Sequence, residues 1–423
     1  MDKYLYSLPE NIREKDYIVA TYYISLEKDV DIVKKASSLA IGQTIGTWVP
    51  VPGITDELRE KYMGKVIQIF DIPSLDLSTQ INGEERQYLI QIAYPTANFT
   101  PDFPLLITAL LGNDASTSAQ VKLIDIEFPK AYAESFSGPR YGIDGIRRIT
   151  GVKDRPLLLN MIKPCTGLTP EEGAGIFYQT ALGEVDMIKD DELLGSPGYS
   201  KAYDRVKAFK KAAEAAYEKT GRRVLYLANV TDGSSTIMDT IEKVIEAGAE
   251  AVMVNFAAVG YSMLMQIART VDVPILAHLA GAGMFYEGIQ SGMSSPLAVG
   301  KLTRLAGADT VMVNTPYGGY PMLHQKYMQI IQQLTLPLYN IKPVMPSIGG
   351  GVHPGMVEKY MKELGNDIIL AAGGAVQGHP MGAAAGANAM MQAIKAVMAG
   401  IPVEEAAKEK EELSAALKLW NNK

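Results

Sequence analysis

Eight short apolar segments, each followed by a helix-like segment, occupy the chain from residue 157 onward and constrain its fold more than any other feature. They span residues 157–163, 185–190, 224–230, 251–256, 274–278, 310–314, 342–346 and 368–372. Continuous apolar runs are typical of parallel strands that are covered on both faces. Eight βα units within about 250 residues predict an α/β fold, a C-terminal (β/α)8 TIM barrel. An open, doubly wound sheet is the alternative.

The segments between and after these strands have helical character. We expect helices at 170–182, 202–218, 237–247, 297–305 and 355–364, and a final amphipathic helix at 403–419 on the outside of the barrel.

The first part of the chain has a different order of strands and helices. Strands are expected at 17–26, 65–71, 88–93 and 121–128, and helices at 31–39 and 104–111. The order βαββαβ is that of a ferredoxin-like α+β domain. A loop rich in Gly and Pro at 137–142 then separates the two parts. We therefore predict an N-terminal domain at 1–137 and a barrel domain with a C-terminal helix at 138–423.

Charge and composition exclude several classes of partner. The net charge is −7 and no block of basic residues occurs, so neither nucleic acid nor a membrane is expected as a partner. No apolar run reaches membrane length, and residues 1–17 carry charges throughout instead of an export signal. The single cysteine, Cys165, cannot form an intrachain disulfide. Together these features predict a cytoplasmic protein.

The second apolar segment of the barrel ends in four charged residues, Lys189-Asp190-Asp191-Glu192. Lys189 and Asp191 share one face of a strand, and Glu192 joins them where the strand ends. Two carboxylates suit a hard cation such as Mg²⁺. A lysine joins such a ligand set only as a carbamate formed with CO2. The alternative is a solvated acidic turn beside a lysine that reaches water.

Two further strand ends carry groups suited to proton transfer. Lys163 ends the first strand and could act as an acid or base, its pKa lowered by burial and a nearby metal; the alternative is a lysine at the rim. His278 ends the fifth strand and is either catalytic or a hydrogen-bonded structural residue. With 4 histidines and no His-x-His pair, a zinc hydrolase site is not expected.

Glycine-rich loops follow the last two strands. Gly350 and Gly351 follow the seventh, and Gly373 and Gly374 follow the eighth. Glycine lets backbone N–H groups approach an anion, and these two loops are the usual phosphate site of TIM barrels. The sequence therefore predicts a phosphate site there.

Six motifs in one order connect these features with a known family. They lie at 46–48, 112–113, 162–164, 186–192, 350–353, and 373–374 with 378–380. On these motifs the chain resembles the ribulose-bisphosphate carboxylase (RuBisCO) superfamily over nearly its whole length. The resemblance implies a carbamylated Lys189 that completes a Mg²⁺ site with Asp191 and Glu192. It also implies a homodimer, or a multiple of dimers, in which Thr47, Trp48 and Asn113 reach the partner's barrel.

Departures from the carboxylases narrow the function. Their lysine-tipped loop after the sixth strand reads here Asn-Thr-Pro-Tyr-Gly-Gly-Tyr at 314–320 and holds no lysine. Their second phosphate site corresponds to Leu279, Met312 and Gly349, whereas the first is retained in Thr47, Gly351, Gly373 and Gly374. Cys165 replaces a lysine, and Gly42 stands where they have a glutamate. Carboxylation is therefore not expected, and the substrate should carry one phosphate and a smaller or apolar other end.

This pattern is similar to that of RuBisCO-like proteins (form IV), above all the methionine-salvage enolases that act on 2,3-diketo-5-methylthiopentyl 1-phosphate. The shared segments lie at 45–48, 92–95, 139 with 142–147, 300–309 and 316–318. Asn113 stands where those enolases have their proton-abstracting lysine. Because an amide is not a base, Lys163 or the Lys189 carbamate would take the proton, and His278 could shuttle it.

The sequence thus predicts a Mg²⁺-dependent enolase or isomerase of a keto-sugar monophosphate. Three alternatives remain open. They are a decarboxylase or transcarboxylase of a 3-oxo-acid sugar phosphate, a Schiff-base aldolase using Lys163, and a non-catalytic protein that binds a phosphometabolite.

Overall fold

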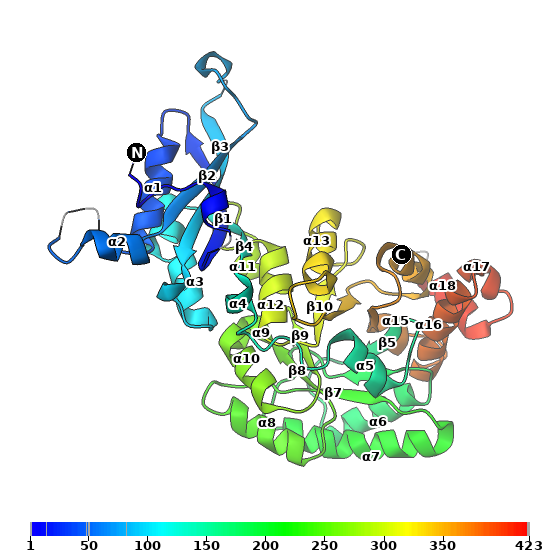
Figure 1. The fold of residues 1–423 in the computed structure, drawn as a ribbon. Helices are drawn as coiled ribbons and strands as arrows, with labels where there is room; N and C mark the ends of the chain where they lie inside the picture. The colour runs from blue at the N-terminus through cyan, green and yellow to red at the C-terminus, as the bar shows by residue number, and fades with distance from the viewer. Residues whose placement is uncertain (1, 14, 48, 50, 82, 421–423) are drawn as a thin grey trace. The chain divides into compact units, whose positions relative to one another are not determined.

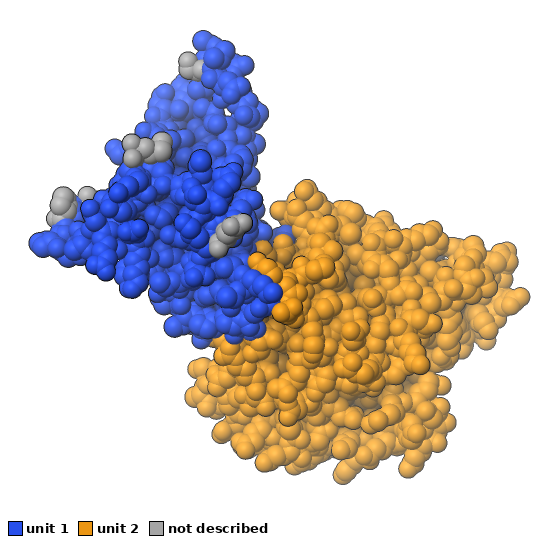
Figure 2. All heavy atoms as spheres, in the orientation of Figure 1, with its two compact units in different colours: residues 1–136, 282–298 blue, residues 137–281, 299–423 orange. Residues whose placement is uncertain are grey.

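The computed structural model describes residues 2–13, 15–47, 49, 51–81 and 83–420. The chain divides into two compact units, coloured separately in Figure 2. The first unit comprises Met1–Phe136 together with Ala282–Ala298, and the second comprises Ser137–Gly281 with Val299–Lys423.

The first unit is built on a four-stranded sheet in the order β2-β3-β1-β4. Its strands are β1 (Tyr17–Glu27), β2 (Lys65–Ile72), β3 (Glu85–Pro95) and β4 (Lys122–Glu127), and each pairing is antiparallel. Helices α1 (Ile32–Gly42) and α3 (Phe103–Leu111) complete the βαββαβ order, which confirms the ferredoxin-like prediction. The alternation along β3 buries Tyr88, Ile90 and Ile92 on the core face.

Two elements of this unit had no sequence signal strong enough to be predicted. Helix α2 (Asp56–Tyr62) buries none of its residues, so it lacks the apolar period that identifies a helix. Its start is instead fixed by Thr55, whose side chain accepts a hydrogen bond from the N–H of Leu58. The other element is a π-helical turn, η4 (Asp114–Ala119), directly before β4.

Residues 282–298, which we had expected in the barrel domain, belong to the first unit. Their main chain pairs with β4: the N–H of Leu123 donates to Gly292, and the N–H of Ser294 donates to Leu123. The hydroxyl of Ser294 also donates to the carbonyl of Ile124, at 2.6 Å. These hydrogen bonds link a distant part of the sequence to the edge of the small sheet.

The second unit is a closed barrel of eight parallel strands, which confirms the TIM-barrel prediction (Figure 1). The strands are β5 (Leu157–Met161), β6 (Met187–Lys189), β7 (Leu225–Asn229), β8 (Val252–Asn255), β9 (Ile275–His278), β10 (Thr310–Asn314), β11 (Met345–Gly349) and β12 (Ile369–Ala372). The helices that alternate with them include α6 (Pro170–Ala181), α7 (Ala202–Thr220), α8 (Ile237–Glu246), α10 (Tyr261–Thr270), α13 (His324–Thr335), α14 (Val357–Leu364) and α16 (Ala383–Met398). No helix within the described ranges is both long and apolar enough to cross a bilayer.

The boundaries of several elements differ from the sequence-based prediction. The seventh barrel strand, expected at 342–346, is β11 at Met345–Gly349, because Ser347 pairs with Met312 on one side and with Ile369 on the other. The helix expected at 297–305 is a π-helical turn, η5 (Pro296–Lys301), followed by α12 (Leu302–Leu305). The C-terminal helix is split into α17 (Val403–Ala406) and α18 (Glu411–Trp420), and both contact α16.

An aromatic cluster joins two outer helices to the barrel wall. Phe177 of α6 and Phe209 of α7 have ring centroids 5.3 Å apart, and Phe209 lies 4.7 Å from Tyr226 of β7. All three rings are buried. Such a cluster combines a large buried apolar area with favourable ring–ring geometry.

Phe209→Ala should leave a cavity in this cluster. We expect the free energy of unfolding to fall by about 3–5 kcal/mol, as for other buried Phe→Ala changes. Phe70→Ala is the matched control, because Phe70 is 44% exposed; it should change the value by less than about 0.5 kcal/mol. Urea denaturation of both variants measures the difference, and equal losses would contradict the assigned packing.

Candidate active site

The end of β6 brings three charged groups to the carboxyl end of the barrel. The Lys189 side chain is 0% exposed, and its Nζ donates to the carbonyl of Asp190 at 2.9 Å and to Glu192 Oε2 at 3.4 Å. Burial lowers the pKa of Lys189, and the neighbouring Glu192 carboxylate acts in the opposite direction. Because its side chain is fully buried, Lys189 does not reach water, as it would beside a solvated acidic turn.

Asp190 points to the opposite side of the strand, as the alternation of a strand requires. Its carboxylate accepts hydrogen bonds from Arg205 Nη2 at 2.9 Å, Tyr226 Oη at 2.7 Å and the N–H of Asn229 at 2.8 Å. Arg205 and Asp190 are each only 1% exposed. This buried, fully hydrogen-bonded pair fixes the backbone from which Lys189 and Asp191 project to the other side.

Asp191 is paired with Lys163, which lies two residues beyond the end of β5. Lys163 Nζ lies 2.6 Å from Asp191 Oδ2 and 3.1 Å from Cys165 Sγ. Burial by itself would lower the pKa of Lys163, but the hydrogen bonds to Asp191 and Cys165, together with the charge of Asp191, outweigh burial and raise that pKa above its usual value. In this arrangement the Asp191 carboxylate stabilises the ammonium form of Lys163.

Two asparagines that the sequence analysis missed hold the backbone around Glu192. Asn255 Nδ2 donates to the carbonyl of Glu192 at 2.8 Å, and Asn229 Nδ2 donates to the carbonyl of Asp191 at 3.1 Å. Each asparagine is the last residue of its strand, β7 or β8. A polar residue that ends a buried strand was the signal available in the sequence.

His278, the last residue of β9, faces the same cluster. Its Nε2 lies 3.4 Å from Glu192 Oε2, and its Nδ1 accepts a hydrogen bond from the N–H of Ala280. Burial, with Lys189 and Lys163 nearby, places the pKa of His278 well below its usual value. The contact with Glu192 is therefore no ion pair. The imidazole is neutral, and because Nδ1 is an acceptor, the proton resides on Nε2 and faces the site.

The two glycine loops lie beside these groups. Gly350 and Gly351 have φ values of +86° and +82°, which residues other than glycine rarely adopt. At Gly373, an added Cβ would lie 3.7 Å from Lys163 Cε. The second loop therefore brings an open backbone close to Lys163. We call residues 349–351 together with Gly373 and Gly374 the glycine cradle.

The region that corresponds to a second phosphate site is apolar. Leu279 is 7% exposed and Met312 is 4% exposed. A Cβ added at Gly349 would lie only 2.5 Å from Met312 Cε. Met312 therefore fills the space that a serine side chain at position 349 would need. The buried Leu279 stands where the carboxylases have an arginine.

The remaining predicted residues belong to the first unit. Thr47 Oγ1 donates to the carbonyl of Val49 at 3.1 Å, and Asn113 precedes the turn η4. Trp48 lies outside the described residues. At Gly42 an added Cβ would meet Asp114 Oδ2 at 2.0 Å, so Asp114 takes the space where a glutamate side chain would start.

The donor set at the barrel mouth fits a hard cation only if Lys189 is modified. Among the described residues, no group of three or more His, Cys, Asp or Glu side chains is placed to hold a metal ion. Asp191 and Glu192 supply two carboxylates, and the buried Nζ of Lys189 lies next to Glu192. A carbamate on that nitrogen would add the third oxygen ligand that Mg²⁺ favours.

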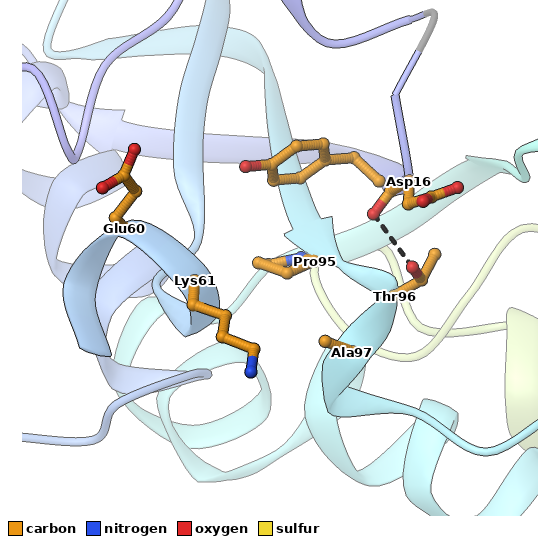
Figure 3. A pocket seen from close by; sticks show the side chains of 7 residues that line it. Asp16, Glu60, Lys61, Pro95, Thr96 and Ala97 are labelled. Carbon is orange, nitrogen blue, oxygen red and sulfur yellow. Dashed lines mark hydrogen bonds between the residues drawn. The ribbon is translucent and has the colours of Figure 1, made fainter. Parts of the chain in front are cut away.

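Three cavities lie away from this cluster, and two of them lie in different units of the chain. One of about 640 Å³ is at the opposite, amino ends of the barrel strands, where Arg155 pairs with Asp186 and Arg223 pairs with Glu250. The other, of about 370 Å³, lies in the first unit beside Asp16 and Lys61 (Figure 3). In a TIM barrel, chemistry is found at the carboxyl ends of the strands. The Lys189 cluster is therefore the candidate active site.

The fold is that of a TIM-barrel protein, and the charged cluster lies at the carboxyl ends of its strands, where proteins of this fold carry their sites. Models of the ribulose bisphosphate carboxylase large chain match residues 142–420 with the catalytic domain and residues 6–132 with the N-terminal domain. The chain therefore belongs to the RuBisCO large-chain family.

Individual relatives lie in the RuBisCO-like branch. A ribulose bisphosphate carboxylase-like protein of Archaeoglobus fulgidus is 42% identical, over 93% of this chain and 90% of its own length. A 2,3-diketo-5-methylthiopentyl-1-phosphate enolase of Geobacillus kaustophilus is 36% identical, over 95% of this chain and 98% of its own. The crystal structure of a rubisco-like protein (MtnW) from Alicyclobacillus acidocaldarius superposes with a TM-score of 0.88 at 35% identity, covering 96% of this chain and 100% of that one.

Arg205→Met should destabilise the barrel strongly, because it leaves the Asp190 carboxylate buried without its cation. We expect the free energy of unfolding to fall by about 3–5 kcal/mol. Arg223→Met is the matched control: its pair with Glu250 is exposed, and such pairs contribute less than about 1 kcal/mol. Urea denaturation compares the two, and a small loss for Arg205→Met would refute the supporting role assigned to this pair.

Proposed function

We propose that this protein is a Mg²⁺-dependent enolase of a keto-sugar monophosphate, with 2,3-diketo-5-methylthiopentyl 1-phosphate as the first candidate substrate. The proposal rests above all on one arrangement. Lys163, Lys189, Asp191, Glu192 and His278 converge at the barrel mouth, with the glycine cradle beside Lys163 and an apolar surface at Leu279 and Met312.

Lys189, Asp191 and Glu192 are the residues that would hold the cation, with Lys189 as its CO2-derived carbamate. When bound, Mg²⁺ would polarise the carbonyl oxygens of the substrate and so acidify the neighbouring C–H bond. The network around Asp190 and the two asparagines would keep the backbone of these ligands in place, which is the usual task of residues behind a metal site.

The proton would move between groups at the barrel mouth. Asn113 carries an amide and cannot take it, so the acceptor would be Lys163 or the carbamylated Lys189. Lys163 is an ammonium while it is paired with Asp191, and in that form it can donate to a developing oxyanion. The Nε2–H of His278 lies close enough to Glu192 to pass a proton within the site.

The two ends of the substrate would be recognised in different ways. Gly351, Gly373 and Gly374 would bind the single phosphate through backbone N–H groups, with Thr47 and Trp48 contributed by the partner subunit. Leu279 and Met312 would face the apolar end, where a second dianion would find no cation. A methylthio-substituted chain fits this division better than a bisphosphate.

We propose a homodimer, or a multiple of dimers, as the active assembly. Thr47, Trp48 and Asn113 belong to the first unit of the chain, whereas the charged cluster belongs to the second. In the family resemblance the first unit of one subunit serves the barrel of its partner. Light scattering of the purified chain tests this proposal, and a stable monomer with full activity would refute it.

Carbamylation can be measured without an activity assay. With ¹³CO2 and Mg²⁺, we expect a carbamate carbon resonance in the NMR spectrum of the wild type and its loss in Lys189→Met, because that variant lacks the amine. Lys163→Met is the matched control and should retain the resonance. A resonance that persists in Lys189→Met would show that another amine is modified.

Enolisation can be followed by the exchange of substrate hydrogen with solvent deuterium in 2,3-diketo-5-methylthiopentyl 1-phosphate. We expect Mg²⁺- and CO2-dependent exchange in the wild type and a loss of about 10²-fold or more in Lys163→Met. Lys362→Met, in which an exposed lysine of α14 is changed, should leave the rate unaltered. Exchange that survives EDTA and CO2 removal would refute the mechanism, and CO2 released from a 3-oxo-acid sugar phosphate would favour decarboxylation.

A further inference from the structure

The loop that follows β10 is attached to the glycine cradle by hydrogen bonds at its start. The N–H of Thr315 donates to the carbonyl of Gly349 at 3.2 Å, and Thr315 Oγ1 donates to the carbonyl of Gly350 at 2.9 Å. Tyr360 of α14, which is buried, donates in turn to Thr315 Oγ1 at 3.1 Å. Thr315 therefore ties the loop to both the cradle and the helix behind it.

Direct backbone packing continues this attachment further along the loop. A Cβ added at Gly318 would lie 1.9 Å from the carbonyl oxygen of Gly350, and one added at Gly351 would lie 2.6 Å from Gly318 Cα. Both positions therefore require glycine for a steric reason. The backbones of the loop and the cradle are therefore in direct contact, with no room for a side chain between them.

Tyr317, in the middle of loop 315–320, attaches the loop to α14. Its hydroxyl donates to Glu363 Oε1 at 2.6 Å, and Lys359 Nζ lies 3.7 Å from the centroid of its ring. Burial, together with the Glu363 carboxylate, raises the pKa of Tyr317 to about 12, so the hydroxyl stays a donor near neutral pH. His324 also faces this carboxylate, with Nε2 3.7 Å from Oε1.

We propose that the Tyr317–Glu363 hydrogen bond is a latch that holds loop 315–320 on the Gly350–Gly351 backbone, so that the cradle is assembled before a phosphate arrives. Tyr317 is then a positioning residue that acts through the glycines without touching the ligand. The identification of the cradle as the phosphate site rests on the proposed function, whereas the latch rests on the contacts of Tyr317 alone.

This arrangement differs from that of a mobile lid. A loop that must open and close over a ligand needs few fixed contacts, because each contact adds to the free energy of opening. Here one short stretch carries three side-chain hydrogen bonds, a cation above an aromatic ring and a glycine–glycine contact. Such a loop lowers the ordering cost of ligand binding, which is the advantage of preorganisation.

Hydrogen–deuterium exchange of the full chain tests the latch directly. In Tyr317→Phe, we expect the peptides covering 315–322 and 349–353 to exchange about tenfold faster, the effect of losing one hydrogen bond to a charged group. Tyr320→Phe is the matched control in the same loop, because Tyr320 is 77% exposed, and it should exchange like the wild type. Glu363→Gln retains an acceptor and should lie between the two.

Calorimetric titration with inorganic phosphate tests the consequence of the latch for phosphate binding. We expect Kd to rise about three- to tenfold in Tyr317→Phe and to be unchanged in Tyr320→Phe. Unchanged exchange in Tyr317→Phe would overturn the latch, and faster exchange with an unchanged Kd would overturn its role in preassembly. If the wild type binds no phosphate, the phosphate site of the proposed function fails and preassembly fails with it, whereas the exchange result still decides whether the latch exists.

Discussion

The geometry of the candidate active site depends on the alternation of side chains at the end of β6. Asp190 points outward into a buried network with Arg205 and Tyr226, and Lys189 and Asp191 consequently point to the barrel mouth. A slip by one residue would exchange the two sets and place the Arg205 partner where a ligand belongs. Because a buried pair of this kind is costly to break, it fixes the register of the strand.

From this fixed strand the site is assembled by contacts between the ends of several barrel strands. Lys163 reaches across from β5 to Asp191, His278 faces Glu192 from β9, and Asn229 and Asn255 hold the intervening carbonyls. The contacts of Lys163 and Asn229 join β6 to its neighbours β5 and β7, whereas Asn255 and His278 reach the end of β6 from β8 and β9, across the barrel opening. The site is therefore a property of barrel closure, and its chemistry follows from which strand ends are polar and which, as at Leu279, are apolar.

The apolar surface at Leu279 and Met312 and the attached loop after β10 both distinguish this site from that of a carboxylase. A carboxylase needs a second phosphate site and a loop that closes with a cation over the substrate. In this chain Met312 fills the space beside Gly349, and the loop after β10 is held by Tyr317 and Thr315 against the cradle. Both changes favour a smaller monophosphate substrate that binds to a surface already in place.

The sequence by itself determined the two-part architecture, because apolar patterns with periods of 2 and 3.6 residues can be recognised without knowledge of tertiary contacts. It also identified the charged strand end at 189–192 and the glycines at 350–351 and 373–374, which are local in the chain. Tertiary structure alone decided the membership of residues 282–298, the position of β11, the Lys163–Asp191 pair and the attachment of Tyr317 to Glu363. Each of these joins residues far apart in the chain, and no local pattern encodes which distant group will neutralise a charge or complete a sheet.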